Sequence, residues 1–397
     1  MTQLDPRAAM HLSDAAVSVE LETPEMTLNI GPQHPSTHGV LRLVAQVDGE
    51  RVSSVDPVIG YMHRGYEKLA EVRTYAQTTA LVNRIDWVSG FANEIPFVGA
   101  VEKLMGLEVP ERAQYIRMIL TEMARISSHL VFMSSYPLEL GAATPLMHAL
   151  REREHVLELL ESVTGGRFHP NFNRVGGVKP VAGGGSNMKK QSQDLPAGFL
   201  AATDKAMTNV LDVCDDLDKL VTGNELFQAR TVGVGVIPAE KALEYGMSGP
   251  NARASGVKFD LRKAEALLPY DGIDFEVPVG HNGDCFDRYV VRNDEIRQAA
   301  SIIRQAIAKL PSGPLQAKVP RILKVPKGEV YVRAENPKGE MGYYIISEGG
   351  RLPYRVKIRS ASFSNLSILP WVLEGELVPD LVAIMGSLDF VLGDVDR

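Results

Sequence analysis

The sequence predicts an α+β fold with a central bundle of long helices between two β-containing ends. Stretches with helical apolar spacing occupy the middle of the chain, and stretches of alternating apolar residues occupy both ends. With 397 residues, of which 45% are hydrophobic and 23% charged, the chain has the composition of a large globular protein. We see no internal repeat and no linker.

The first β-containing region is expected over residues 26–64, after an N-terminal extension at 1–25 that we expect to be flexible. A turn is predicted at Gly31-Pro32. Apolar residues alternate with polar ones on both sides of it: Met26, Leu28 and Ile30, then Leu41, Leu43 and Ala45.

Helical spacing begins near Gly65 and predicts a helical core over residues 65–310. Prolines at first-turn positions open three of the expected helices. These prolines are Pro110, Pro145 and Pro196, and a fourth helix is expected over 294–310. The apolar faces of the first two helices are Ile116, Ile119, Leu120, Met123, Ile126 and Leu130, then Leu146, Leu150, Leu157 and Leu160. Long helices with short connections favour a bundle.

Strands return after Pro326 within a C-terminal α+β region at 311–397. The strand residues are Val330 and Val332, Tyr343 and Ile345, then Tyr354, Val356 and Ile358, with turns at Gly339 and Gly349-Gly350. The chain ends in a dense, partly apolar motif at 387–397, which predicts a buried or docked C-terminus.

Charge and hydropathy exclude some classes of function. The net charge of −7 indicates no general affinity for nucleic acid. No apolar run approaches the roughly 20 residues of a membrane helix, and residues 1–25 lack the apolar segment of a secretory signal. We therefore expect a cytoplasmic chain, for which any membrane attachment would have to come from partners.

Cysteine usage argues against a redox metal in this chain. Cys214 and Cys285 are the two cysteines, and they are far apart in the sequence. A cysteine-ligated iron–sulfur cluster takes about four thiolates, and a structural zinc site also takes about four ligands. We expect both cysteines to be reduced thiols and the chain to bind no metal or cluster itself.

The sharpest local motif is Gly-Pro-Gln-His-Pro-Ser-Thr-His-Gly-Val at residues 31–40. Its two prolines exclude a helix, so His34 and His38 do not share a helical face as a metal pair would. A strand–turn–strand tip that displays two imidazoles suits proton donation near neutral pH. The plain alternative is a pair of ordinary loop histidines.

Several motifs in order resemble one family. They are the run 31–43, His63-Arg64-Gly65 with Glu67-Lys68, Arg151 to Glu154, Arg167-Phe168-His169, Asn173 to Gly177, Arg253 to Gly256, Gly342-Tyr343-Tyr344 and Gly393 to Arg397. Together, over about residues 25–397, they resemble the D subunit of NADH–quinone oxidoreductase, respiratory complex I. That family is similar to the large subunit of nickel–iron hydrogenases, so a hydrogenase-like α+β fold is implied.

The hydrogenase resemblance also addresses the missing metal. Arg84 to Ser89 and Asp389 to Arg397 match the two motifs that hold the hydrogenase metal pair. The four thiolate positions are occupied here by Asp86, Ser89, Val391 and Asp394. Two carboxylates, a hydroxyl and a valine do not replace four soft ligands, so the cavity is free for another ligand. Four aspartates of these segments are either buried and paired with Arg84 or Arg397, or transmit changes toward a membrane arm: Asp86, Asp389, Asp394 and Asp396.

The resemblance implies a quinone head-group site beside the terminal iron–sulfur cluster of a partner. Its expected quinone-binding residues are His34, His38, Trp87 and Val391, with His38 and Glu139 as the catalytic pair. Arg64, Arg84 and His169 are expected near the partner's cluster, although Arg64 also fits an ion-paired helix start with Glu67 and Lys68. Implied partners are the small iron–sulfur B subunit, the C subunit, the ferredoxin-like I subunit and the A and H membrane subunits. NADH, FMN and the clusters belong to the partners, and quinone is the substrate.

Two positions depart from the family. Glu139 stands where aspartate is usual, and Trp87 stands where the family has its quinone tyrosine. An indole N–H donates a hydrogen bond but releases no proton near neutral pH. An altered acceptor and a non-catalytic scaffold therefore stay open beside quinone reduction. A third alternative is a metal-containing hydrogenase-like subunit, and the cysteine count argues against it.

Overall fold

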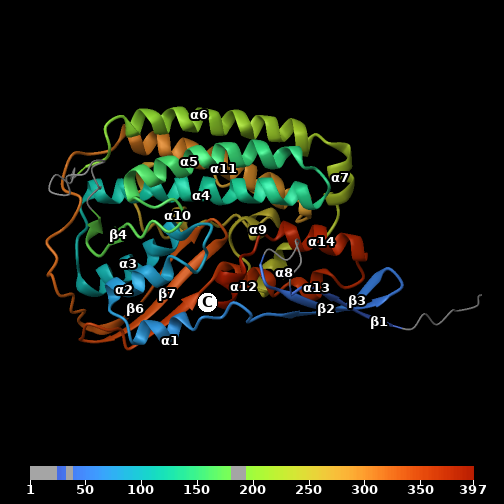
Figure 1. Cartoon of the computed structure of the whole chain (residues 1–397), viewed down its shortest axis with the longest axis horizontal. Coiled ribbons are helices and arrows are strands. Elements are labelled where there is room, and N and C mark those ends of the chain that lie inside the picture. The colour runs from blue at the N-terminus through green and yellow to red at the C-terminus, as the bar shows by residue number, and fades with distance from the viewer. Residues whose placement is uncertain (1–24, 33–38, 180–193) are drawn as a thin grey trace, which may run out of the picture.

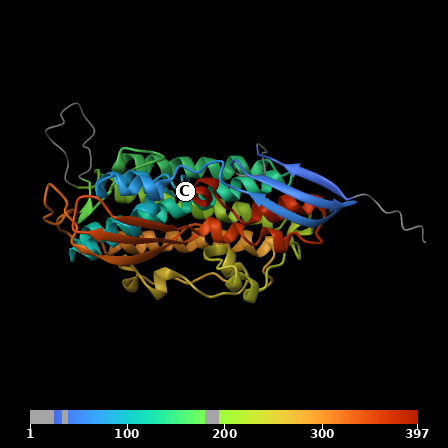
Figure 2. The ribbon, with the colours of Figure 1, turned by 90° about the horizontal axis from the view of Figure 1, so that it is seen from below.

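The computed structural model describes residues 25–32, 39–179 and 194–397, and its α+β architecture confirms the predicted fold class. The molecule is elongated, with long helices along one side and the larger sheets along the other (Figure 1). Seen from below, the N-terminal sheet lies at one end and the C-terminal sheet toward the other (Figure 2).

The N-terminal sheet is an antiparallel meander. It consists of β1 (Met26–Ile30), β2 (Arg42–Asp48) and β3 (Arg51–Val58) in that order. Leu43, Ala45 and Val47 alternate toward the core on β2 and are buried, as period-two spacing requires. The backbone of Val52 donates a hydrogen bond to Glu376 and accepts one from Gly375. These bonds attach the N-terminal sheet to the C-terminal region.

The bundle is built from four long helices. These are α4 (Glu111–Glu139), α5 (Thr144–Thr164), α6 (Phe199–Leu217), which continues as a π-helical turn at Asp218–Thr222, and α11 (Cys285–Ala308). Helix α4 packs against α5 and α11, and α6 covers the other side of both (Figure 1). The predicted apolar face of α4 is buried throughout.

Two details of the predicted bundle are wrong. Helix α11 begins at Cys285, nine residues before the predicted start, because the Asp284 side chain accepts the backbone N–H of Asp287 and caps it. Its first turns bury Arg288 and Arg292, whose charges hide the apolar spacing. Leu150, predicted on the inner face of α5, is 38% exposed, since spacing alone does not say how far a neighbouring helix covers a stripe.

The bundle core contains a buried ion network. Helix α4 contributes Glu122, Arg125 and His129, and α9 (Gly249–Ala254) contributes Arg253. Arg262 lies in α10 (Leu261–Ala264) and Asp260 is the N-cap of that helix. The other members are Glu295 of α11 and Glu335 of β6. Arg253 lies 2.6 Å from Glu295 and 2.8 Å from Glu335, and Arg262 lies 2.7 Å from Asp260. Burial raises the pKa of Glu295 and Asp260, but these guanidinium charges outweigh it and hold both pKa values well below their usual range.

The C-terminal sheet is antiparallel and carries helices on one side. Strands β6 (Lys327–Asn336), β7 (Gly339–Glu348) and β8 (Arg355–Arg359) follow in order. Helices α1 (Tyr66–Glu71), α2 (Tyr75–Val82) and α3 (Gly90–Met105) lie over it, with α3 against β6 and β7 and α1 against β8 (Figure 1). Thr74 and Gln77 form a capping box that starts α2.

Short elements complete the described chain: β4 (Asn173–Arg174), β5 (Gly177–Val178), α7 (Glu225–Thr231), α8 (Ala239–Glu244), a 3-10 turn at Tyr270–Gly272, α12 (Ala361–Leu366), α13 (Leu369–Val372), α14 (Val378–Ser387) and α15 (Leu392–Asp396). Helix α15 packs on α12, and the C-terminus lies near the middle of the molecule (Figure 1). None of the helices described here is both long enough and apolar enough to span a bilayer.

Candidate functional site

The C-terminus is held by the loop before α1. The Asp396 carboxylate accepts the backbone N–H groups of Gly60 and Met62 at 2.8 and 2.7 Å, and the Asp396 carbonyl lies 2.6 Å from His63 Nδ1. The backbone N–H of Arg64 donates to the Arg397 carbonyl at 3.2 Å. This confirms the prediction of a docked C-terminus and places the exposed Arg64 beside it.

The helix start after Arg64 is ion-paired. Glu67 accepts from Lys357 at 2.6 Å and from the backbone N–H of Ile358 at 3.0 Å, and Lys68 pairs with Glu71. The sequence-based alternative of an ion-paired start is therefore confirmed for Glu67 and Lys68. It ties α1 to the edge of the C-terminal sheet.

The two segments that match the hydrogenase motifs meet in the structure. A Cβ atom at Gly393 would lie only 2.8 Å from the Ile85 carbonyl oxygen and 3.7 Å from Trp87 Cδ1, so the chains approach as closely as glycine permits. Ser89 Oγ donates to Asp86 Oδ2, and Asp86 Oδ1 accepts from the backbone N–H of Val88 at 3.1 Å. The four residues at the positions of the hydrogenase thiolates are all buried: Asp86, Ser89, Val391 and Asp394.

The two carboxylates of this buried site hold protons more tightly than usual. Burial and then the nearby Asp86 carboxylate raise the pKa of Asp394 to about 6, against the hydrogen bond from Ser362. Burial also raises the pKa of Asp86, which the Lys338 charge opposes. Like charges in a dry site disfavour double ionisation, so one proton is readily retained here.

Lys338 is a site residue that the sequence did not reveal. It stands in the β6–β7 turn as Pro-Lys-Gly, which is typical of a solvated hairpin tip, yet it is buried. Its Nζ lies 2.5 Å from Asp389 Oδ1, and Arg292 Nε lies 3.4 Å from Asp389 Oδ2. Pairing with Arg84 or Arg397, one of the two alternatives from sequence, is therefore wrong for Asp389.

Aromatic residues form the rim next to this site. Trp87 is 38% exposed and stacks on Phe168, with ring centroids 5.4 Å apart. His169 Nδ1 lies 2.9 Å from Asn83 Oδ1, and burial, then the Arg84 charge, lowers the pKa of His169. The structure thus brings the predicted residues Trp87, Arg84 and His169 to one rim.

Glu139 ends α4 at a tight contact with α14. A Cβ atom at Gly386 would lie 2.2 Å from Glu139 Oε2 and 3.1 Å from Tyr136, so glycine leaves room for the half-buried carboxylate. The predicted residues His34 and His38 lie outside the described residues, and the pairing of His38 with Glu139 stays a prediction. Gly39, which follows His38, lies against Leu392: a Cβ atom there would be 3.1 Å from Leu392 Cβ.

Within the described parts of the chain, no three His, Cys, Asp or Glu side chains are arranged to hold a metal ion. Cys214 and Cys285 are both buried and free. The hard oxygen atoms of Asp86, Ser89 and Asp394 are poor ligands for the soft metal pair of a hydrogenase.

Comparison with known proteins decides the family. The model of the respiratory-chain NADH dehydrogenase 49 kDa subunit matches residues 139–324 and 318–397. The D subunit of the NADH-quinone oxidoreductase of Clostridium beijerinckii is 48% identical over 378 residues, which are 95% of this chain and 99% of that protein. The chain belongs to this family.

Two further relatives agree. The second D subunit (D 2) of the NADH-quinone oxidoreductase of Salinispora tropica is 50% identical, across 94% of this chain and 93% of that protein. The D subunit from Carboxydothermus hydrogenoformans is 47% identical, across 95% and 100%. As a member of the 49 kDa subunit family, the chain is part of an oxidoreductase complex of the complex I class.

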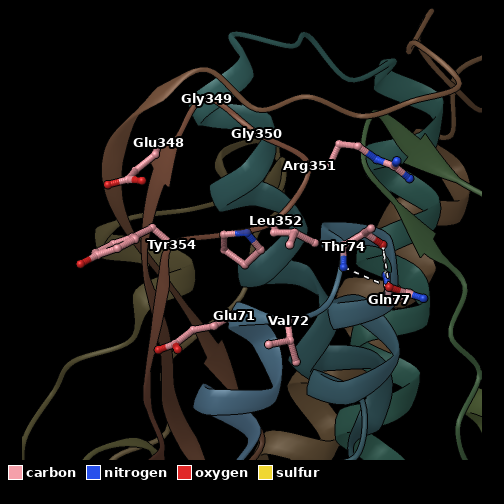
Figure 3. Close-up of a pocket in the computed structure, with 11 residues that line it drawn as sticks. Glu71, Val72, Thr74, Gln77, Glu348, Gly349, Gly350, Arg351, Leu352 and Tyr354 are labelled. Carbon is pink, nitrogen blue, oxygen red and sulfur yellow. Dashed lines mark hydrogen bonds between the residues drawn. The ribbon is translucent and has the colours of Figure 1, made fainter.

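One open cleft of this 49 kDa-type subunit lies away from the predicted site. A cleft of about 900 Å³ lies between the α1–α2 connection and the β7–β8 loop, and Figure 3 shows Val72, Leu352 and Tyr354 around it. Its lining includes none of the site residues predicted from sequence. The structure instead brings together the buried residues Asp86, Val391 and Asp394, and the exposed Trp87 lies at their rim.

Proposed function

We propose that this chain forms the quinone head-group site of a proton-translocating NADH:quinone oxidoreductase. The single observation that carries the proposal is the meeting of the 84–89 loop, the C-terminal 391–394 segment and Gly39. Gly39 lies against Leu392, which brings the end of the two-histidine loop beside Val391. The pKa values of Asp86 and Asp394 are raised, so these groups bind protons readily, which suits a quinone that takes up two electrons and two protons.

The electrons come from the terminal iron–sulfur cluster of a partner, in the proposed complex the small B subunit. Arg84, His169 and Arg64 lie near that cluster, and the C and I subunits and the A and H membrane subunits complete the contacts. NADH, FMN and the clusters are on the partners. The complex is attached peripherally on the cytoplasmic side of the cell membrane, and this chain contributes binding, orientation and protons.

In the proposed mechanism His38 hydrogen-bonds one quinone carbonyl oxygen and donates a proton as negative charge develops there. Glu139 orients the imidazole and favours its charged form. His34 and Val391 border the head group, and the Trp87 indole N–H donates to the second carbonyl oxygen. Trp87 holds this oxygen but supplies it with no proton.

The test is His38→Ala in the assembled complex. We expect quinone reductase activity to fall by a factor of roughly 10² to 10⁴, as for a lost general acid. Electron transfer from NADH to ferricyanide, which does not need the quinone site, should stay near wild type. His281→Ala, at an exposed loop histidine, is the matched control and should change neither rate.

Two outcomes contradict the proposal. If His38→Ala retains wild-type quinone reduction, His38 is not the donor. If the wild-type complex oxidises NADH with ferricyanide but reduces no quinone, the chain is the non-catalytic scaffold or serves another acceptor. Trp87, in place of the quinone tyrosine, is the observation that favours this second function.

A further inference from the structure

The β6–β7 hairpin ends in a tight turn that packs against the start of α9. Asn336 of β6 pairs with Gly339 of β7, so a short turn that includes Lys338 joins the strands. A Cβ atom at Gly249 would lie 2.4 Å from Gly339 Cα, and one at Gly339 would lie 2.5 Å from Ser248 Oγ. Glycine at both positions lets the two backbones touch. The turn therefore has little room to shift.

Side-chain contacts also fix this turn. Glu335, near the end of β6, is buried and lies 2.8 Å from Arg253 of the bundle network. The Asn365 amide of α12 donates to the Lys338 carbonyl oxygen at 3.1 Å, and its own oxygen accepts the Ser248 backbone N–H at 3.1 Å. The turn is therefore held to the bundle network on one side and to α12 on the other.

Asn336 holds the loop that carries Trp87. Its side-chain NH₂ group donates to Asn93 Oδ1 at 2.7 Å, and Asn93 Nδ2 donates to the Asp86 backbone carbonyl at 3.0 Å. A carbonyl oxygen only accepts, so Asn93 must turn its NH₂ group to Asp86 and its oxygen to Asn336. All three residues are buried, where an unpaired amide oxygen is costly. This chain of bonds fixes the Asp86 backbone and the adjacent Trp87.

Lys338 holds the segment that carries Val391. Its Nζ lies 2.5 Å from Asp389 Oδ1, and Arg292 Nε lies 3.4 Å from the other carboxylate oxygen. Asp389 has a φ of 52°, a left-handed conformation that non-glycine residues rarely adopt. It forms the bend between α14 and Val391. Because removing one partner of a buried ion pair is costly, Lys338 secures this bend.

We propose that Asn336 and Lys338 are positioning residues for quinone reduction. The turn that carries them holds one segment through each side chain, and so sets the spacing between Trp87 and Val391. The two segments approach as closely as glycine permits at Gly393, so a small shift of either one changes the site. This deepens the proposed function and rests on it.

The spacing matters for the chemistry of the proposed site. A proton donor acts when it lies about 2.6–3.2 Å from the oxygen that receives the proton, and a misplacement of about 1 Å costs about 10²-fold in rate. Trp87 holds one carbonyl oxygen of the quinone, and Val391 borders the head group. A loosened segment therefore lets the head group tilt away from His38 although it still binds.

Lys338→Met and Asn336→Leu in the assembled complex test this role. Each replacement nearly keeps the side-chain volume and removes the polar contact. We expect the kcat/KM for short-tailed ubiquinone and menaquinone analogues to fall by about 10- to 10²-fold. Electron transfer from NADH to ferricyanide should stay near wild type. The matched controls, Lys258→Met and Asn282→Leu at exposed residues, should change neither rate.

A double variant separates positioning through Asp389 from a general packing defect. Asp389→Asn removes the charge that Lys338 binds, and asparagine tolerates the left-handed bend. If Lys338 acts through Asp389, adding Asp389→Asn to Lys338→Met should lower kcat/KM by less than about 3-fold more. Losses that simply multiply would refute this path. Asn336→Leu removes no charge, so it tests the turn even if Lys338→Met prevents assembly.

The outcomes distinguish the two proposals. If His38→Ala abolishes quinone reduction while Lys338→Met and Asn336→Leu equal their controls, the quinone site stands and the positioning role is refuted. Quinone and ferricyanide rates that fall in the same proportion also refute it, since the defect then lies in assembly. If His38→Ala has no effect, the proposed quinone site itself fails.

Discussion

Two buried regions of this molecule use the same carboxyl groups in opposite ways. In the ion network of the bundle, the acids lie within hydrogen-bond distance of arginine, as Glu295 does at 2.6 Å from Arg253. Around α15 and α3, Asp394 and Glu94 are equally buried but have backbone, serine and asparagine partners. The pKa of Glu295 is held well below its usual range, whereas burial raises the pKa of Asp394 to about 6.

The difference teaches that burial alone does not set the charge of an acid. A guanidinium nearby compensates the lost hydration, and the acid stays ionised as a structural tie. Neutral donors compensate less, and the acid stays ready to bind a proton. The bundle network therefore serves as scaffold, and the acids near the C-terminus are suited to chemistry.

The largest expected effect comes from breaking the network. Arg253→Met leaves Glu295, Asp260 and Glu335 without their shared cation, and we expect it to lower the free energy of unfolding by about 3–5 kcal/mol. Urea unfolding of the full chain measures it. The control is Arg297→Met, which removes the partly exposed ion pairs with Asp215, Asp218 and Asp294 and should cost about 1 kcal/mol or less. Equal losses would refute the contrast between buried and exposed pairs.

A smaller effect should appear at Asp394, and its sign depends on pH. The folded pKa of about 6 is above the unfolded value near 3.8, so the folded state binds the extra proton. The stabilisation is full below about pH 4 and is lost as pH rises through about 6. Asp394→Asn should therefore stabilise the chain at pH 8, by about 1–3 kcal/mol, and change little at pH 4.5.

Denaturant unfolding at the two pH values checks this, with Asp212→Asn on the exposed face of α6 as the control. The control should show no pH-dependent difference from wild type. A destabilisation by Asp394→Asn that is larger at pH 8 than at pH 4.5 would mean that the folded carboxyl is ionised and paired.

Much of the fold could be predicted because its elements follow local rules. The prolines before α4 and within the first turn of α5, and the alternation along β2, each depend on a few neighbouring residues. The start of α11 could not be predicted, because its first turns bury two arginines. Arg288 donates to the Gly235 carbonyl and Arg292 to the Ser387 carbonyl. Buried charge erases the hydrophobic period on which prediction depends.

The site residues also divide into those that the sequence could predict and those that it could not. Trp87, Arg84 and His169 were predicted from motifs and meet at one rim, because motifs record positions that share a site. Lys338 was missed, since it reaches Asp389 by tertiary packing from the β6–β7 turn. A lysine in a Pro-Lys-Gly turn carries no local signal of a buried acidic neighbour.

We expect Glu335 to be an exception to the contrast between the two regions. The network holds four carboxyl groups, Glu122, Asp260, Glu295 and Glu335, against the guanidinium groups of Arg125, Arg253 and Arg262. His129 adds no charge near neutral pH, because burial lowers its pKa to about 4. One carboxyl is therefore in excess. Burial raises the pKa of Glu335 in spite of Arg253, so we expect Glu335 to keep its proton.

The smallest predicted effect follows from that proton. Glu335→Gln still accepts from Arg253 through its amide oxygen and loses the bond from the Leu261 N–H, so the free energy of unfolding at pH 7 should fall by only about 1 kcal/mol. Glu295→Gln, which removes a charge bonded to Arg253 and His129, should cost about 3 kcal/mol or more. Equal costs would mean that Glu335 is ionised, and the network would then hold an uncompensated negative charge in a dry core.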